Sequence, residues 1–217
     1  MPEVVATCTA SSLQEYPAIF KKSFQVIQSA LTLNLRGKDG ISLTESNHLD
    51  KQVIEIRNLW NDSDTFKVGE IISLAKRIKK CFDCGGTLAF AGNGGSAAEA
   101  NHLAAEFVGR CVVDHIPMKS LSFSSNNSVI TAIVNDYGAE KIFSRQAEAF
   151  LNSDSILIGL STSGKSRNVL EGLKTAKDIG AHTVFWTSKL QTEKLNFIDE
   201  VWKVDSSITP QIGRAHV

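Results

Sequence analysis

Residues 87–110 read TLAFAGNGGSAAEANHLAAEFVGR, and this stretch decides the fold of the chain. Its first five residues are mostly apolar and predict a short buried strand. Three glycines follow within four positions, which is typical of a tight turn where the backbone can approach a ligand. Ser96 is the predicted N-cap of the next helix, and Glu99 completes a capping box. A strand, a glycine turn and a helix N-terminus in succession indicate an anion-binding site.

Two residues of the predicted helix, His102 and Glu106, are candidates for chemistry. They are four positions apart, so both side chains project from one face of the helix. A histidine and a carboxylate beside an anion site can transfer protons, and they can also supply two of the four ligands that zinc prefers. For His102 taken alone, a packed structural histidine is an equally good interpretation.

The composition is that of a globular protein of one domain, or of one domain with an appendage. Of the 217 residues, 42% are apolar and 21% are charged. The 23 basic and 23 acidic side chains balance, so we expect no direct binding of nucleic acid. The apolar runs are too short to span a membrane, and the first residues lack a secretory signal pattern. The pair Cys81 and Cys84 has no second pair at zinc-ribbon spacing, which favours plain thiols in a reducing cytoplasm.

The rest of the chain alternates between strand-like and helix-like segments. Further strands are predicted at 117–123, 155–160, 182–187 and 201–204. Helices are predicted at 16–35, 49–60, 66–81, 129–134, 140–151, 168–179 and 192–197. This alternation predicts an α/β fold, an open parallel five-stranded sheet with helices on both faces, preceded by N-terminal helices.

A second special loop, Ser161-Thr162-Ser163-Gly164-Lys165-Ser166, also follows a predicted strand and opens a predicted helix. Ligands of open parallel sheets bind at the carboxyl ends of the strands, so both loops can face one crevice. Hydroxyl groups together with the N–H groups of a helix N-terminus can bind a phosphate. A capped turn with incidental serines is the simpler interpretation, but four hydroxyls in six residues favour the anion site.

Two nucleotide-binding patterns also match the sequence. Residues 92–97 fit the G-x-G-x-x-A pattern of dinucleotide-binding folds, but the strand predicted at 117–123 is not followed by the acid that a ribose needs. Residues 159–166 fit the P-loop pattern G-x-x-x-x-G-K-S, which is the more serious alternative. A P-loop enzyme also needs an acid to help hold magnesium, and Asp205 is the only candidate. This interpretation leaves the histidine–glutamate helix without a role.

Four segments together resemble the phosphoheptose isomerases, which are sugar isomerase (SIS) domain proteins. The family carries a Gly-Asn-Gly-Gly-Ser turn, a helix with His and Glu four apart, a Thr-Ala-Ile-x-Asn-Asp-Tyr-Gly segment and a Ser-Thr-Ser-Gly-x-Ser loop. These segments lie here at 92–96, 102–106, 131–138 and 161–166. The resemblance covers about residues 48–211 and implies an SIS-type, flavodoxin-like three-layer sandwich.

The resemblance further implies an aldose–ketose isomerase. Its substrate is sedoheptulose 7-phosphate, its product is D-glycero-D-manno-heptose 7-phosphate, and its pathway makes heptose for lipopolysaccharide and other surface glycans. The family is a cytoplasmic homotetramer with active sites between subunits. An alternative within the fold is a non-catalytic protein that binds a phosphosugar or a replication initiator. Such regulators tend to lose the carboxylate at the Glu106 position, so its presence favours the enzyme.

Individual roles also follow from the resemblance. Glu106 is the implied base that moves a proton between the first two sugar carbons through an enediol. His102 and Glu106 are implied ligands of one Zn²⁺ ion per subunit, found in some members. The implied substrate-binding residues are Asn93, Gly94, Gly95, Glu106, Asn135 and Asp136, together with the phosphate cradle of Ser161, Thr162, Ser163 and Ser166.

Beyond residue 211 the sequence departs from the family. Gly213 stands where the resemblance implies a metal-binding Gln, and the implied second acid/base, a His eight residues later, would follow Val217. Residues 212–217 read as a translated sequencing adapter, so we expect a non-native tail in place of a C-terminal helix. Residues 1–47 are expected to form an N-terminal extension, partly helical or disordered, before an SIS domain at 48–211.

Overall fold

Five parallel strands form one sheet within residues 68–110, 114–188 and 194–204, the residues that the computed structural model describes. The strands are β1 (Leu88–Gly92), β2 (Ser120–Ser122), β3 (Ile156–Ser161), β4 (His182–Ser188) and β5 (Glu200–Val204). All of them belong to one unit of the chain, Lys51–Val217. The predicted five-stranded parallel sheet is therefore confirmed. The helices predicted at 16–35 and 49–60, and the positions after 204, lie outside the described residues.

The strand order places the two special loops beside each other. Across the sheet the order is β2-β1-β3-β4-β5, so β2 is added on one side of β1 and the later strands on the other. In open parallel sheets, ligands bind where the strand order reverses, beyond the carboxyl ends of the strands. Here the reversal lies between β1 and β3, whose register pairs Gly92 with Leu160. The loop that leaves β1 is the glycine turn, residues 92–94, and the loop that leaves β3 is the serine loop, residues 161–166.

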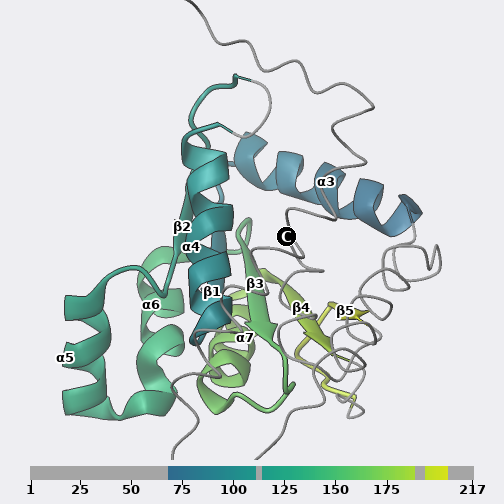
Figure 1. Cartoon of the computed structure of the whole chain (residues 1–217). Helices are drawn as coiled ribbons and strands as arrows, with labels where there is room; N and C mark the ends of the chain where they lie inside the picture. The colour runs from purple at the N-terminus through teal and green to yellow at the C-terminus, as the bar shows by residue number, and fades with distance from the viewer. Residues whose placement is uncertain (1–67, 111–113, 189–193, 205–217) are drawn as a thin grey trace, which may run out of the picture. The chain divides into compact units, whose positions relative to one another are not determined.

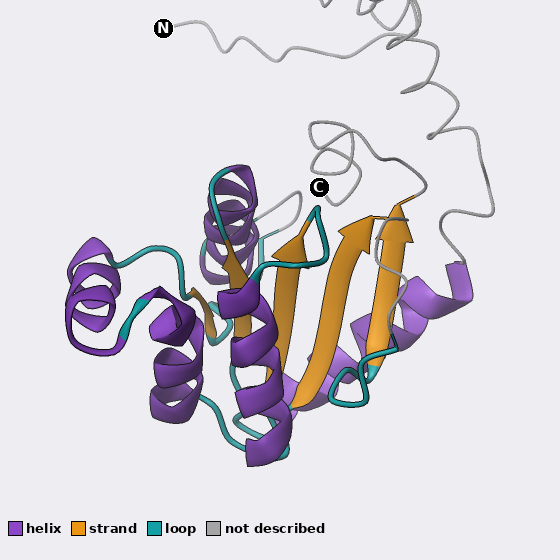
Figure 2. Cartoon of the chain, turned by 90° about the horizontal axis from the view of Figure 1, so that it is seen from below, coloured by secondary structure: helices purple, strands orange, loops and turns teal. Residues whose placement is uncertain are grey.

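Helices cover both faces of the sheet (Figures 1 and 2). One face carries α3 (Val68–Asp83) and α4 (Gly95–Val108). The other carries α5 (Asn127–Tyr137), the 3₁₀ turn η1 (Ala139–Lys141), α6 (Ile142–Phe150) and α7 (Arg167–Ile179). This is the three-layer sandwich that the resemblance implied.

The apolar run of β1 serves both layers. Leu88 and Phe90 pack in the core beneath α3 and α4, whereas Ala89 and Ala91 pack in the core beneath α5, α6 and α7. Successive side chains of a strand point to opposite faces, so a strand covered on both sides must be apolar throughout. This explains why the central strands are continuous apolar runs in the sequence.

Several predicted elements differ from the structure, among them the helix predicted at 129–134, which spans Asn127–Tyr137. The strand predicted at 117–123 is shorter, because the N–H of Met118 donates to the carbonyl of Phe107 in α4 (3.0 Å) and pairing with β1 starts only at Ser120. The helix predicted at 192–197 is wrong over its described part, where residues 194–199 form an irregular turn. The carbonyl of Phe197 accepts a hydrogen bond from Thr183 (2.9 Å), which ties this segment to β4 instead.

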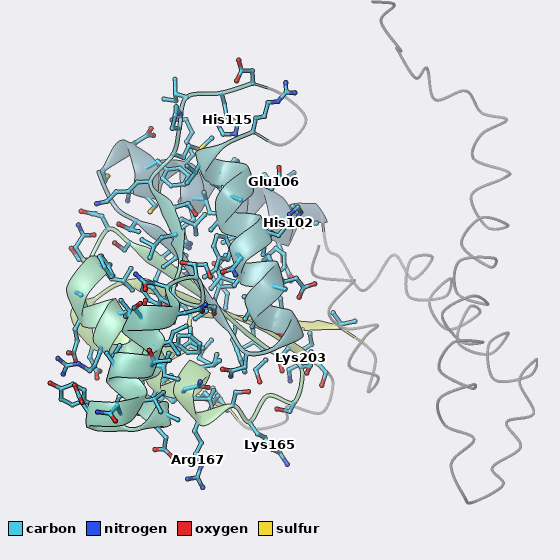
Figure 3. All side chains as sticks on the ribbon, turned by 60° about the vertical axis from the view of Figure 1, so that its left-hand side comes forward. His102, Glu106, His115, Lys165, Arg167 and Lys203 are labelled. Carbon is cyan, nitrogen blue, oxygen red and sulfur yellow. The ribbon has the colours of Figure 1, made fainter. Side chains whose placement is uncertain are left out.

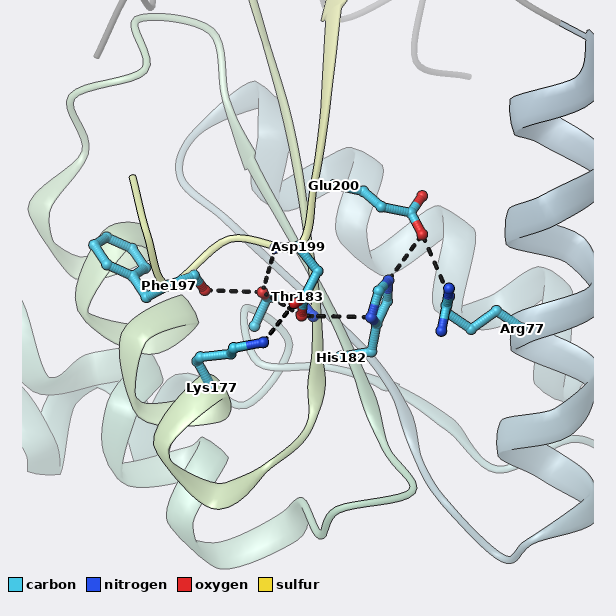
Figure 4. A network of polar contacts seen from close by, with 7 residues as sticks. All are labelled: Arg77, Lys177, His182, Thr183, Phe197, Asp199 and Glu200. Atoms are coloured by element: carbon cyan, nitrogen blue, oxygen red, sulfur yellow. Dashed lines mark hydrogen bonds and ion pairs between the residues drawn. The ribbon is translucent and has the colours of Figure 1, made fainter. Parts of the chain in front are cut away.

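A polar network closes the opposite edge of the sheet, at the amino ends of β4 and β5 (Figure 4). His182 lies between two carboxylates, with Nε2 2.9 Å from Oε1 of Glu200 and Nδ1 3.4 Å from Oδ2 of Asp199. Arg77 of α3 pairs with Glu200 at 3.3 Å, and Lys177 of α7 pairs with Asp199. The network therefore connects one helix of each layer, α3 and α7, to the amino ends of β4 and β5. The carboxyl ends of the strands lie at the other end of the sheet.

The packing of α7 on β3 predicts the effect of adding a methyl group at Gly159. A Cβ there would lie 2.8 Å from Leu173 and 2.9 Å from Val169, closer than carbon atoms can pack. We expect Gly159→Ala to lower the free energy of unfolding by about 1–3 kcal/mol through overpacking. The control is Gly69→Ala in α3, where an added Cβ meets nothing within 4 Å. It should raise stability by up to about 1 kcal/mol because alanine favours a helix. Urea unfolding measures both, and an equally stable Gly159→Ala would contradict this packing.

Candidate active site

The glycine turn starts at Gly92, the last residue of β1, and ends at Gly94, the N-cap of α4. An added Cβ at Gly92 would lie 2.6 Å from the backbone oxygen of Ser96, so only glycine lets the helix start this close to the strand. Gly94 has a φ of 56°, in the left-handed region that favours glycine. The predicted tight turn is therefore confirmed, and the glycines let the helix start close to the strand.

The predicted capping box at Ser96 and Glu99 is wrong. The helix begins at Gly95, one residue before Ser96, and no side chain caps its N-terminus. The carbonyl of Gly94 accepts the first hydrogen bonds instead, from Ala97 and Ala98 at 3.1 and 3.2 Å. The start of the helix moves because glycine adopts the positive φ that the turn requires. The N-terminus is thus not occupied by a serine side chain, and an anion can take that place.

Ser124, in the loop after β2, holds the glycine turn on one side. Its hydroxyl donates to the carbonyl of Gly92 at 2.7 Å and accepts from the N–H of Gly92 at 3.2 Å. The two residues are 32 positions apart. Ser124 was not among the predicted site residues, because a contact over this separation leaves no local pattern.

The serine loop joins β3 to α7 and gathers its hydroxyl groups. Ser161 donates to the hydroxyl of Ser166 at 2.9 Å, and its own oxygen lies 3.5 Å from that of Ser163. Gly164 turns the loop with a φ of 68°. Ser166 is the N-cap of α7, yet its hydroxyl does not bond to the helix. Three of the four predicted cradle hydroxyls therefore meet in front of a helix N-terminus that Ser166 does not cap, and Thr162 lies in the same turn.

Two asparagines connect the loops. Asn93 of the glycine turn donates its Nδ2–H to Oδ1 of Asn168 at 2.9 Å, and Asn168 returns a hydrogen bond to Oδ1 of Asn93 at 2.8 Å. Asn168 is in the first turn of α7. The prediction that the two loops lie together is thus confirmed. Asn168 was not among the predicted site residues, because the pairing spans 75 positions.

His102 and Glu106 project from the same side of α4 (Figure 3), as their spacing predicted. Nε2 of His102 is 3.8 Å from Oε1 of Glu106, and the two side chains are 56% and 30% exposed. Oε2 of Glu106 is buried and has no hydrogen-bond partner among the described residues. Such an orphaned oxygen is costly to bury, and it is free to accept a proton or coordinate a ligand.

This pair can fill part of a zinc site. Histidine nitrogen and carboxylate oxygen are ordinary zinc ligands, and the orphaned oxygen of Glu106 suits that use. Within 68–110, 114–188 and 194–204, however, no group of three or more histidine, cysteine or acidic side chains gathers around one point. Two further ligands would have to come from elsewhere.

His115 lies beyond the end of α4 (Figure 3) and contacts two carbonyl oxygens. Its Nε2 is 3.2 Å from the backbone oxygen of Glu106 and its Nδ1 is 2.9 Å from that of Ile116. A carbonyl can only accept, so a neutral imidazole makes one of these bonds and the imidazolium makes both. With its Nε2 protonated, His115 donates to the backbone carbonyl of Glu106, a contact that sequence reasoning missed.

Asn135 and Asp136 occupy the last turn of α5 and are exposed. The amide of Asn135 donates to the carboxylate of Asp136 at 2.7 Å. Between the described residues, no hydrogen bond or ion pair connects either side chain to the glycine turn or the serine loop. The structure thus brings these two predicted substrate residues to each other and not to the rest of the site.

Lys165 argues against the P-loop interpretation. In a P-loop, the lysine reaches back to the phosphates of the nucleotide. Here Lys165 is exposed and points away from the body of the protein (Figure 3). Its N–H donates to the hydroxyl of Ser163 at 3.2 Å, so its backbone supports the loop while its side chain faces solvent.

The cysteines of the CxxC pattern are not bonded to each other. Cys81 is buried, Cys84 is exposed, and both are free thiols. Burial raises the pKa of Cys81 to about 11, which keeps this thiol protonated and unreactive. No helix in the described part of the chain is long and apolar enough to span a membrane.

Comparison with known proteins identifies close relatives. The SIS domain family model matches residues 53–188. A probable phosphoheptose isomerase of Thermoplasma acidophilum is 40% identical over 150 residues, which are 69% of this chain and 82% of that protein. The phosphoheptose isomerase of Syntrophotalea carbinolica is 36% identical over 162 residues, covering 75% of this chain and 83% of the relative. The solved phosphoheptose isomerase of Neisseria gonorrhoeae superposes with a TM-score of 0.70 at 28% identity, covering 80% of this chain and 92% of that one.

Glu99 is the second acidic residue of α4 with an orphaned oxygen. Its Oε2 is buried and has no hydrogen-bond partner in the described part of the chain. Burial raises its pKa from 4.5 to about 7. The folded state thus favours the protonated carboxyl, and the stability this gives is fully present below pH 4.5 and is lost as the pH rises through about 7.

This sign predicts the behaviour of Glu99→Gln, which is neutral at every pH. We expect the variant and the wild type to differ little at pH 4.5, and the variant to be the more stable at pH 8. Urea midpoints across this range measure the difference, with Glu148→Gln, an exposed carboxylate in α6, as the control. A stability difference that stays constant with pH for Glu99→Gln would show that this carboxyl is solvated.

Proposed function

We propose that the chain, which belongs to the SIS-domain family and within it to the phosphoheptose isomerases, converts sedoheptulose 7-phosphate to D-glycero-D-manno-heptose 7-phosphate. One observation carries this proposal: the glycine turn and the serine loop lie side by side at the strand-order reversal, joined by Asn93 and Asn168. One loop offers hydroxyl groups and a helix N-terminus for a phosphate, and the other starts the helix that carries Glu106.

The phosphate binds at the serine loop in this proposal. Ser161, Ser163 and Ser166 supply hydroxyl donors, and the first N–H groups of α7 add the positive end of the helix dipole. Neutral donors are sufficient because a phosphate oxygen accepts several hydrogen bonds at once. Anchoring the phosphate fixes one end of the sugar, so that its first two carbons can lie against α4.

Glu106 performs the proton transfer. A proton on carbon 1 of the ketose is acidified by the carbonyl at carbon 2, and a carboxylate can remove it to give an enediol. Return of the proton to carbon 2, with loss of the proton from the oxygen on carbon 1, yields the aldehyde of the aldose. The orphaned Oε2 of Glu106 is free for this task, and His115 holds the backbone at the same residue. The proton transfers between the two sugar oxygens require another group, which the family resemblance places after residue 211.

Zinc, assembly and location are further parts of the proposal. His102 and Glu106 would hold one Zn²⁺ ion per subunit, together with ligands from outside the described residues. Bound zinc would supply a positive charge that stabilises the enediolate oxygens. The family resemblance supports a cytoplasmic homotetramer with shared active sites and a place in heptose synthesis for surface glycans. An interface site would also explain why, among the described residues, neither Asn135 nor Asp136 bonds to the two loops.

Proton NMR in D₂O tests the function. Incubation of the protein, extended by the C-terminal helix that the resemblance implies, with sedoheptulose 7-phosphate should produce the anomeric signal of the aldose, with deuterium at its carbon 2. The same substrate should raise the melting temperature, and ATP with magnesium should not. Stabilisation by ATP with magnesium alone would favour a nucleotidase. Stabilisation by sugar phosphates without any deuterium exchange would favour a phosphosugar-binding regulator.

The division of labour between the loops predicts opposite effects of two variants. Glu106→Gln keeps the size of the side chain but removes the base, so turnover should fall by about 10²–10⁴-fold with substrate affinity nearly unchanged. Ser163→Ala should instead weaken substrate affinity, since it removes a phosphate donor, and affect turnover less. Steady-state kinetics together with calorimetric titration separates the two. Near-normal turnover of Glu106→Gln would contradict its role as the base.

A further inference from the structure

We propose that Asn168 is a positioning residue that locks the glycine turn to the phosphate loop through Asn93. The inference rests on the proposed function for its kinetic consequence and on geometry for the lock itself. The two amides exchange hydrogen bonds of 2.9 and 2.8 Å, so each supplies one donor and one acceptor to the other. Their planar geometry makes the pair directional, since a rotation or a shift of either loop breaks both bonds.

The orientation of Asn168 is set by its own helix. Oδ1 of Asn168 also accepts the N–H of Val169 at 3.0 Å, one of the donors that the first turn of a helix leaves free. This bond decides which atom of the amide is the oxygen, because the N–H of Val169 can only donate. The amide nitrogen of Asn168 then faces Asn93, which leaves Asn93 one complementary orientation.

Two residues hold the glycine turn, one from each side. Ser124 binds the backbone of Gly92 from the β2 side, and Asn168 binds the side chain of Asn93 from the β3 side. Ser124 therefore ties the glycine turn to the loop after β2, and Asn168 sets the distance between the glycine turn and the serine loop. A substrate fixed by its phosphate reaches α4 at a defined place only if this distance is constant. A small misplacement of the reacting atoms can cost about 10²-fold in rate.

Amide exchange of the protein without ligand tests the lock. We expect Asn168→Ala to increase deuterium uptake in a peptide covering residues 92–96, with uptake in the later turns of α7 unchanged. The matched control is Arg167→Ala, which removes an exposed ion pair of 3.0 Å with Glu140 from the same helix turn. The control should leave the glycine turn as protected as in the wild type. Unchanged protection in Asn168→Ala would overturn the proposal.

Kinetics then tests the positioning role. Asn168→Ala should lower kcat about tenfold or more and change the dissociation constant of inorganic phosphate less than about threefold, because the cradle hydroxyls remain. In a protein that already carries Asn93→Ala, the further substitution Asn168→Ala should have little effect on kcat, since the pair of hydrogen bonds is already broken. Equal effects of Asn168→Ala in both backgrounds would show that the residues act independently. If Asn168→Ala loses protection while the wild-type protein does not isomerise the sugar, that pair of results would uphold the contact between the loops and refute the proposed function.

Discussion

The parallel pairing of β1 with β3 is the constraint on which the rest of the structure depends. Its register sets Gly92 opposite Leu160, so the two strands end together and their loops leave the sheet as neighbours. Each loop then opens a helix on a different face of the sheet, α4 on one and α7 on the other. The arrangement brings two helix N-termini to one point from opposite sides. A phosphate site and a carboxylate for proton transfer can thus lie close together although their residues are far apart in sequence.

The fold was predictable because its signals are local. The continuous apolar runs of the central strands follow from burial on both faces, and Gly180 ends α7 in the left-handed conformation that glycine favours, with a φ of 94°. The errors came from non-local competition. Met118 donates its N–H to the carbonyl of Phe107 and does not pair in β2. The hydroxyl of Thr183 in β4 donates to the carbonyl of Phe197, in a segment where a helix was predicted. Propensity cannot anticipate such partners.

The candidate site was predictable to the same degree. Glycines and serines in short patterns revealed the two loops, and spacing alone placed His102 and Glu106 on one side of a helix. Asn168, Ser124 and His115 support these groups from a distance, through contacts that no short pattern encodes. Glu99, by contrast, was assigned a role that it does not have. Its place three residues after a serine suggested a capping box, whereas the helix starts earlier and a carboxyl oxygen of Glu99 is buried. The two orphaned carboxylates of α4 lower stability, and a site for proton transfer is where such a cost is expected.

A crystal structure of the protein with sedoheptulose 7-phosphate is the most direct test of this account. The account predicts that the phosphate lies within hydrogen-bond distance of the hydroxyls of Ser161, Ser163 and Ser166, at the N-terminus of α7. It also predicts carbons 1 and 2 of the sugar beside the carboxylate of Glu106, with the Asn93–Asn168 pair intact between the two ends of the substrate. A phosphate bound away from the serine loop, or a sugar whose reacting carbons point away from α4, would contradict the central claim.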